Sequence, residues 1–191
     1  MIGQTTHISL LARLGEGADP LAWAEFCHRY GELIRNFARS RNLQPADCDD
    51  VLQDVLMALT RSMPGFEYDP SRGKFRSYLK TVTLHAIFAR SRQNHGQAPL
   101  REGEAAAARP DIESSWDEQW RQYHLRQAMN RIEAEFNESD LAAFTQYALN
   151  GRSAKDTAGA LGLSLDQVYQ AKSRILKRLS TLIDEQVEEE G

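Results

Sequence analysis

The C-terminal third of the chain combines a glycine turn with a strongly basic segment. Residues 161–180 read LGLSLDQVYQAKSRILKRLS, in which four basic side chains accompany one acid, Asp166. The basic residues are Lys172, Arg174, Lys177 and Arg178. The whole chain has a formal net charge of -4, so this positive charge is a local concentration. A basic helix of this kind is typical of surfaces that bind nucleic-acid phosphates.

The residues around the glycine have the spacing of a helix-turn-helix. Ala158 lies where two helices can cross closely, and Gly162 lies where a left-handed backbone is needed. Ser164 can cap the second helix, and Val168 is placed to point between the two helices. This pattern predicts that the second helix enters a DNA major groove.

Helical geometry sorts this second helix into two faces. Val168, Ile175, Leu179 and Leu182 lie on one side. The opposite side mixes groups that suit base edges and phosphates: Asp166, Tyr169, Gln170, Ser173, Arg174 and Lys177. A basic face alone is also typical of a solvated helix in a bundle, but the Ala–Gly–Val spacing favours DNA binding.

The N-terminal half carries an acidic helix of a different kind. In DCDDVLQDVLMAL (47–59), Asp50, Gln53 and Asp54 share one face beside an apolar stripe. Acids in a first helical turn can simply complement the helix dipole, which does not account for Gln53 and Asp54. This face therefore predicts contact with a basic protein partner.

A basic, aromatic segment follows this acidic helix. Residues 71–101 contain seven basic residues and no acid, with Phe75, Tyr78 and Phe88 interleaved. Aromatic and basic side chains together are typical of single-stranded nucleic-acid binding, although Phe75 and Phe88 are expected to be core residues. The preceding turn-rich loop carries Phe66 and Tyr68.

The elements that hold these residues are predicted to be helices only. Apolar residues recur at helical spacing throughout the 191 residues, and alternation of period two does not persist. We therefore expect an all-α chain with two small helical domains, at residues 7–93 and 115–187. The intervening residues 94–114 lack apolar periodicity and predict a flexible linker.

Several classes of function have no support in the sequence. No apolar run approaches a membrane span and the N-terminus has no signal-peptide pattern, so we expect a cytoplasmic protein without membrane insertion. Cys27 and Cys48 are expected to be free thiols. No metal-ligand cluster, phosphate loop or nucleophile–base pair is present, so we expect no cofactor, no metal and no enzymatic activity.

Three segments, in this order, resemble the extracytoplasmic-function (ECF) sigma factors of RNA polymerase. DDVLQDVLMAL resembles their core-polymerase-binding segment, and GKFRSYLKTVTLHAI resembles the segment that melts and reads the −10 promoter element. GRSAKDTAGALGLSLDQVYQAKSRILKRL resembles the region that reads the −35 element. The resemblance implies sigma region 2 over 7–93 and sigma region 4 over 115–187.

The resemblance also implies a role for each matching residue. Asp50, Gln53 and Asp54 would dock on the clamp coiled coil of the largest subunit of core RNA polymerase. The residues expected at the −10 element of promoter DNA are Phe66, Tyr68, Tyr78, Lys80, Thr81, Leu84 and His85. The residues expected at the −35 element are Tyr169, Gln170, Ser173, Arg174 and Lys177. Tyr78 stands where tryptophan is usual in the family, which keeps an aromatic ring at this position. Leu84–His85 stands where Arg–Asn is common, so the usual base contacts of those two residues do not carry over to this chain.

Two hypotheses about function follow. The first is a sigma factor that directs promoter-specific transcription and has an anti-sigma factor as a further conceivable partner. The second is a stand-alone helix-turn-helix regulator that binds duplex DNA without polymerase.

Overall fold

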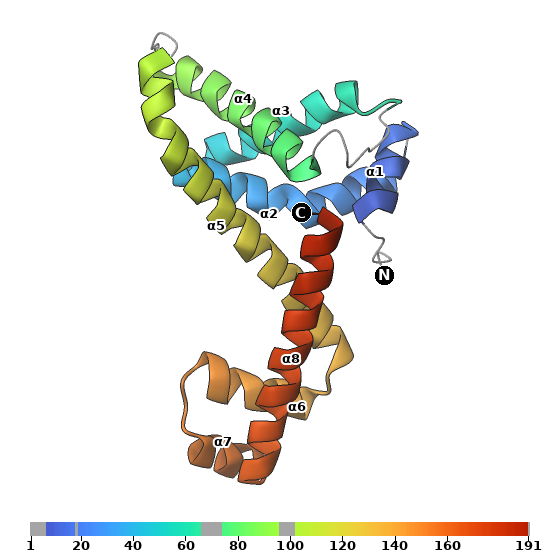
Figure 1. Ribbon diagram of the computed structural model, residues 1–191, viewed down its shortest axis with the longest axis vertical. Helices are drawn as coiled ribbons and strands as arrows, with labels where there is room; N and C mark the ends of the chain where they lie inside the picture. Colours follow the sequence, from blue (N-terminus) through green and yellow to red (C-terminus); the bar gives the residue numbers. More distant parts are fainter. Residues whose placement is uncertain (1–6, 18, 66–73, 96–101, 191) are drawn as a thin grey trace. The chain divides into compact units, whose positions relative to one another are not determined.

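The computed structural model describes residues 7–17, 19–65, 74–95 and 102–190 (Figure 1). Within these ranges the chain forms eight α-helices, one π-helical turn and no strand, so the predicted all-α class is confirmed. The contacts divide the chain into two compact units. Unit 1 contains residues 1–123 and 189–191, and unit 2 contains residues 124–188.

Unit 1 is a helical bundle whose elements start at recognisable caps. Its helices are α1 (His7–Gly15), α2 (Pro20–Ser40), α3 (Pro45–Ser62), α4 (Phe75–His95) and the first part of α5 (Glu102–Glu135). Asp19 caps α2, because its carboxylate accepts hydrogen bonds from the backbone N–H groups of Leu21 and Ala22 at 2.9 and 3.1 Å. Pro20 occupies the first turn, where its missing N–H has no cost.

Aromatic side chains form much of the core of unit 1. Phe26, Tyr30 and Phe75 are buried and in mutual ring contact, with centroid separations of 4.9 to 6.3 Å. Phe75 is therefore a core residue, as predicted. Tyr78 is half-buried, and its hydroxyl lies 2.6 Å from the hydroxyl of Ser62.

Cys27 and Cys48 are free thiols, as predicted, and burial raises the pKa of each.

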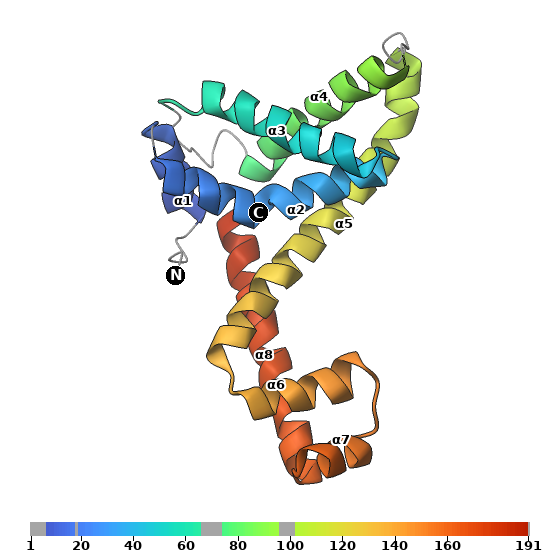
Figure 2. The ribbon, with the colours of Figure 1, turned by 180° about the vertical axis from the view of Figure 1, so that it is seen from behind.

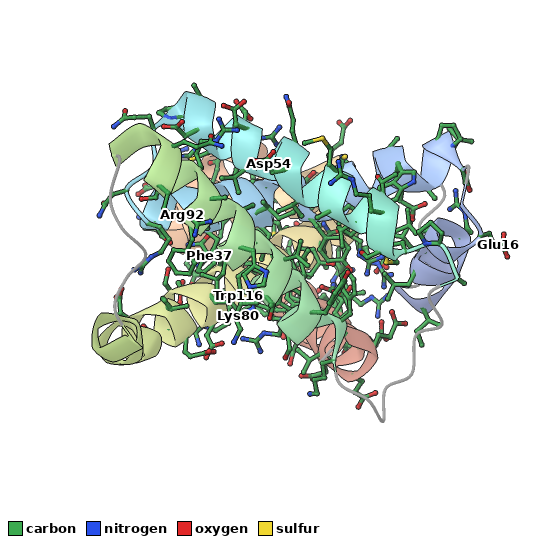
Figure 3. All side chains as sticks on the ribbon, turned by 90° about the horizontal axis from the view of Figure 1, so that it is seen from above. Glu16, Phe37, Asp54, Lys80, Arg92 and Trp116 are labelled. Atoms are coloured by element: carbon green, nitrogen blue, oxygen red, sulfur yellow. The ribbon has the colours of Figure 1, made fainter. Side chains whose placement is uncertain are left out.

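Helix α5 differs from the flexible linker predicted over residues 94–114. Residues 102–114 are helical, and unit 1 extends to Tyr123. Trp116 packs edge-on against Phe37 at a centroid separation of 4.9 Å in the interior of the bundle (Figure 3). Trp120 and Tyr123 stack on Tyr30. These α5 aromatics recur at helical spacing, so they form a stripe that requires an apolar partner, and unit 1 provides it.

Unit 2 places a short helix pair against α8 (Figure 2). Its elements are the end of α5, α6 (Glu138–Phe144), the π-helical turn η2 (Thr145–Leu149), α7 (Ala154–Leu161) and α8 (Leu165–Glu190). Its main core cluster contains Ala128, Ile132, Phe144, Ile175, Leu179 and Leu182. Asn137 caps α6 by accepting a hydrogen bond from the Asp140 N–H at 2.9 Å. Ser139, whose residue type is also common at helix N-caps, lies inside the first turn of α6.

Candidate functional site

The turn between α7 and α8 has the geometry expected of a helix-turn-helix. Gly162 adopts a left-handed conformation, with φ 65° and ψ 31°, and ends α7. Ser164 and Gln167 cap α8 reciprocally: the Gln167 N–H donates to the Ser164 hydroxyl at 3.2 Å, and the Ser164 N–H donates to the Gln167 side-chain oxygen at 2.8 Å. Val168 is fully buried, and Ala158 is buried. The structure thus confirms all four local predictions for this motif.

Helix α8 separates its polar and apolar residues as predicted. Ile175, Leu179 and Leu182 are buried, and the opposite side is exposed. We call this exposed set the reading face: Asp166, Tyr169, Gln170, Ser173, Arg174 and Lys177. Lys172 lies at its edge, half-buried, with its ammonium group 4.9 Å from the centroid of the Tyr147 ring.

Side chains from α5, α6 and η2 hold the flanks of α8. One terminal nitrogen of Arg174 donates to both carboxylate oxygens of Asp140, at 2.8 and 2.9 Å. The ring of Tyr169 lies edge-to-face with that of Tyr147, at a centroid separation of 5.6 Å. Sequence reasoning missed Asp140 and Tyr147. Asp140 is separated from Arg174 by 34 residues, so no local pattern connects them.

A second ion pair lies farther along α8. Arg178 donates to both carboxylate oxygens of Glu135, at 2.7 and 2.8 Å. The hydrogen bond from Arg178 lowers the pKa of Glu135 below its usual range. Arg178 is half-buried and is not part of the reading face.

The acidic face of α3 lies beside a basic residue of α4. We call Asp50, Gln53 and Asp54 the docking face; Gln53 is exposed, and both aspartates are partly exposed. Arg90 bridges the two aspartates, with nitrogen–oxygen distances of 3.0 Å to Asp50 and 3.4 Å to Asp54. The sequence showed Arg90 only as one member of a basic run, so its position against the docking face was missed.

Helix α4 brings part of the predicted −10 set to one surface. Thr81 and His85 are exposed, whereas Leu84 is half-buried against the core of unit 1. A groove of about 470 Å³ runs between α3 and α4, and its lining includes Asp54, Tyr78 and His85. A docking-face residue and two predicted −10 residues therefore share one groove.

Lys80 is less available than its sequence position suggested. Its ammonium group lies 2.6 and 2.7 Å from the two carboxylate oxygens of Glu113 on α5. Arg76, one turn earlier, pairs with Asp117, and its guanidinium lies 5.4 Å from the centroid of a Trp120 ring. The loop residues Phe66 and Tyr68 lie outside the described part of the chain.

The helices were also compared with the length and apolarity that a bilayer requires. In residues 7–17, 19–65, 74–95 and 102–190, no helix combines enough length with enough apolar character to span one.

The chain is similar in sequence to sigma factors of RNA polymerase. The family of sigma-70 region 2 matches residues 26–96. The RNA polymerase sigma factor NccH of Alcaligenes xylosoxydans xylosoxydans is 26% identical over 179 residues, which cover 91% of this chain and 92% of the relative. The RNA polymerase sigma factor CnrH of Cupriavidus metallidurans is 27% identical over 184 residues, which cover 92% of this chain and 93% of the relative.

A solved structure of CnrH in complex with the cytosolic domain of CnrY also matches, with 24% identity and a TM-score of 0.38. That match covers 92% of this chain and 96% of the solved one. The two sigma-factor relatives match along nearly the full chain, and the region 2 match accounts for the N-terminal half, which a stand-alone regulator leaves unexplained. These matches support an ECF RNA polymerase sigma factor that works with core RNA polymerase and promoter DNA and directs promoter-specific transcription.

Proposed function

We propose a division of labour in which unit 1 binds core polymerase and the −10 element, and unit 2 binds the −35 element. The observation that carries the proposal is the reading face of α8, which follows a left-handed glycine turn and is exposed along its first three turns. A capped helix with an exposed mixture of hydroxyl, amide and basic groups suits a DNA major groove.

For polymerase docking, we propose the docking face on α3. Two carboxylates and one amide on adjacent turns offer acceptors and donors to a basic helical partner. Arg90 already occupies part of the acceptor capacity of Asp50 and Asp54, so docking on a basic surface would share or replace that ion pair. Such exchange favours a partner that brings arginine, because its planar fork matches a carboxylate.

For the −10 element, we propose that α4 contributes Tyr78, Thr81 and His85. Tyr78 supplies an aromatic surface for an unstacked base, and Thr81 and His85 are exposed. Leu84 contributes mainly to packing, and Lys80 contacts DNA only after leaving Glu113. Phe66 and Tyr68 remain sequence predictions for the same element.

For the −35 element, we propose that Tyr169, Gln170, Ser173 and Arg174 contact bases and that Lys177 contacts phosphate. These residues are all exposed on α8. We further propose a cytoplasmic location and a purely binding role, since RNA synthesis is the chemistry of the polymerase. An anti-sigma factor stays a prediction of the family resemblance.

The test is multi-round transcription with purified core polymerase and genomic DNA fragments of the source organism. We expect discrete transcripts that require the protein and that disappear with Gln53→Ala/Asp54→Ala. The matched control is Glu118→Ala/Gln122→Ala, which removes one exposed acid and one amide from a different helix, α5. Equal loss of transcripts in both double variants would contradict the docking face, and binding of duplex DNA without any polymerase-dependent transcript would contradict the proposed function.

A further inference from the structure

Two side chains of the α6–η2 segment contact residues of the reading face from its two edges. Asp140 holds Arg174, and Tyr147 holds Tyr169. We propose that Asp140 and Tyr147 are positioning residues that fix Arg174 and Tyr169 and so determine the base preference at the −35 element. This inference rests on the proposed function of unit 2 and adds specificity-determining residues that lie outside the helix-turn-helix itself.

The surroundings of Asp140 hold its carboxylate in a fixed orientation. Its side chain is only 15% exposed, whereas that of Arg174 is 58% exposed. The amide nitrogen of Asn137 donates to one Asp140 oxygen at 3.0 Å, which fixes the carboxylate from the other side. The carboxylate is therefore a rigid acceptor, and the arginine is the exposed partner that it orients.

The hydrogen bonds between Arg174 and Asp140 leave other N–H groups of Arg174 available to contact DNA. Both hydrogen bonds come from the same terminal nitrogen, so the other terminal nitrogen and Nε keep their N–H groups for another acceptor. Guanine offers arginine two major-groove acceptors, O6 and N7, so it is the base that a remaining N–H group of Arg174 is best suited to contact. The geometry therefore points to one guanine in the −35 element as the base that Arg174 reads.

Tyr147 has a corresponding relation to Tyr169 on the other edge. The two rings meet at an interplanar angle of 76°, an arrangement that stabilises aromatic pairs. Tyr169 remains 49% exposed, so one side of its ring is held and the other is available. The ammonium group of Lys172 over the Tyr147 ring adds a further constraint. An apolar ring surface held in this way suits the methyl group of thymine.

Tyr147 lies in the π-helical turn, which separates it from the regular helix that carries Asp140. The Asn150 N–H donates to the Thr145 carbonyl at 2.9 Å, five residues earlier. Turns of this kind are rare in helices and occur frequently at functional sites. The alternative is that both contacts only fasten α6 to α8, and this alternative predicts loss of stability without any change in base preference.

The chain contains a matched control for the charged pair. Glu135 and Arg178 form an ion pair with similar distances, but Arg178 lies outside the reading face. Asp140→Asn and Glu135→Gln each remove one carboxylate of an arginine pair and keep the side-chain size. Only Asp140→Asn is expected to alter base preference.

The experiment uses holoenzyme made from the full chain and core polymerase, on promoters recovered by transcription from genomic fragments. The −35 element is randomised, and transcribed sequences are counted for each variant. We expect Asp140→Asn to lower the preference for guanine at one position by about 5- to 10-fold, the lower end of the discrimination that an arginine–guanine contact supplies. Glu135→Gln should retain the wild-type preference. Arg174→Ala should abolish the same guanine preference.

For the aromatic pair, Tyr147→Ala should lower the preference at a neighbouring position by about 3-fold, and Tyr147→Phe should restore it because the ring contact remains.

Thermal unfolding of each variant accompanies the sequence counts. Wild-type base preference in Asp140→Asn would overturn the inference, as would equal changes in Asp140→Asn and Glu135→Gln. Failure of the wild-type protein to yield promoter-dependent transcripts would instead overturn the proposed function, and the inference with it.

Discussion

Both units carry a basic helix, but they differ in what covers its charges. In unit 1, Lys80 on α4 is paired with Glu113 of α5, and its side chain is 19% exposed. In unit 2, Arg174 on α8 is paired with Asp140 and still has a 58% exposed side chain. The ion pair in unit 1 therefore leaves its basic side chain mostly buried, whereas the ion pair in unit 2 leaves its basic side chain exposed.

This difference shows that positive charge in a sequence does not by itself locate a nucleic-acid surface. The run of seven basic residues in 71–101, with its interleaved aromatic residues, suggested single-stranded nucleic-acid binding. Helix α5 supplies acids to two members of that run, Arg76 and Lys80. The exposed polar residues Thr81 and His85 are then the better candidates on α4.

The comparison depends first on α5 being an integral part of unit 1. Trp116→Ala should lower the free energy of unfolding by about 3–5 kcal/mol, because a buried tryptophan leaves a large cavity. Urea unfolding followed by tryptophan fluorescence measures this change in unit 1, where all three tryptophans lie. Met57→Ala, at an exposed α3 position, should change the free energy by less than about 0.5 kcal/mol. Similar small effects of both substitutions would show that α5 is peripheral.

Unit 2 depends on the turn that presents α8. Gly162→Ala should destabilise unit 2 by about 1–2 kcal/mol, because its φ of +65° is strained for any residue with a Cβ. Gly159→Ala, inside α7, should instead stabilise it by about 0.5–1 kcal/mol. A Cβ has open space at both positions, so only the backbone conformation differs. Amide hydrogen exchange in α7 and α8 measures both changes, and a neutral Gly162→Ala would contradict the left-handed turn.

The availability of the two basic helices can be compared directly through the salt dependence of DNA binding. Lys177→Ala should reduce the slope of log affinity against log salt concentration by about 1, as expected for one lost phosphate contact. Lys80→Ala should leave the slope almost unchanged, because Glu113 already neutralises Lys80. Titration of a recovered promoter with holoenzyme gives both slopes. Equal reductions would mean that Glu113 releases Lys80 on DNA.

The smallest expected effect is the pH dependence of the Glu135–Arg178 pair. The pKa of Glu135 is lowered in the folded chain, so the unfolded chain binds this proton more readily. The stability contribution is present above the unfolded pKa and is lost as the pH falls through the folded one. Glu135→Gln should therefore lose less stability than wild type between about pH 5 and pH 3. Parallel acid-unfolding curves by far-ultraviolet circular dichroism would contradict this expectation.

Short-range patterns predicted the local structure well. The Ser164 cap, the left-handed Gly162 and the two faces of α8 each depend on residues within a few positions of one another. The α6 cap shows where such patterns become ambiguous: Asn137 and Ser139 are both cap formers, and the structure uses the earlier one. Propensity alone does not choose between two good caps so close together.

Long-range contacts were the part that the sequence did not indicate. Arg90 meets the docking face from another helix, and Asp140 meets Arg174 across 34 residues. The predicted domain boundary after residue 114 was missed for the same reason: the aromatic stripe of Trp116, Trp120 and Tyr123 has no local partner, and only the assembled bundle shows that this part of α5 belongs to unit 1.

The π-helical turn makes unit 2 sensitive to chain length as well as to residue type. An i→i+5 turn holds one residue more than an α-helical turn, so removal of one residue from 145–149 would restore a regular helix. Every later side chain would then rotate by about 100° relative to Asp140. Homologous chains that differ by a single insertion or deletion here would therefore present different neighbours to Tyr169, while their reading helices kept the same residues.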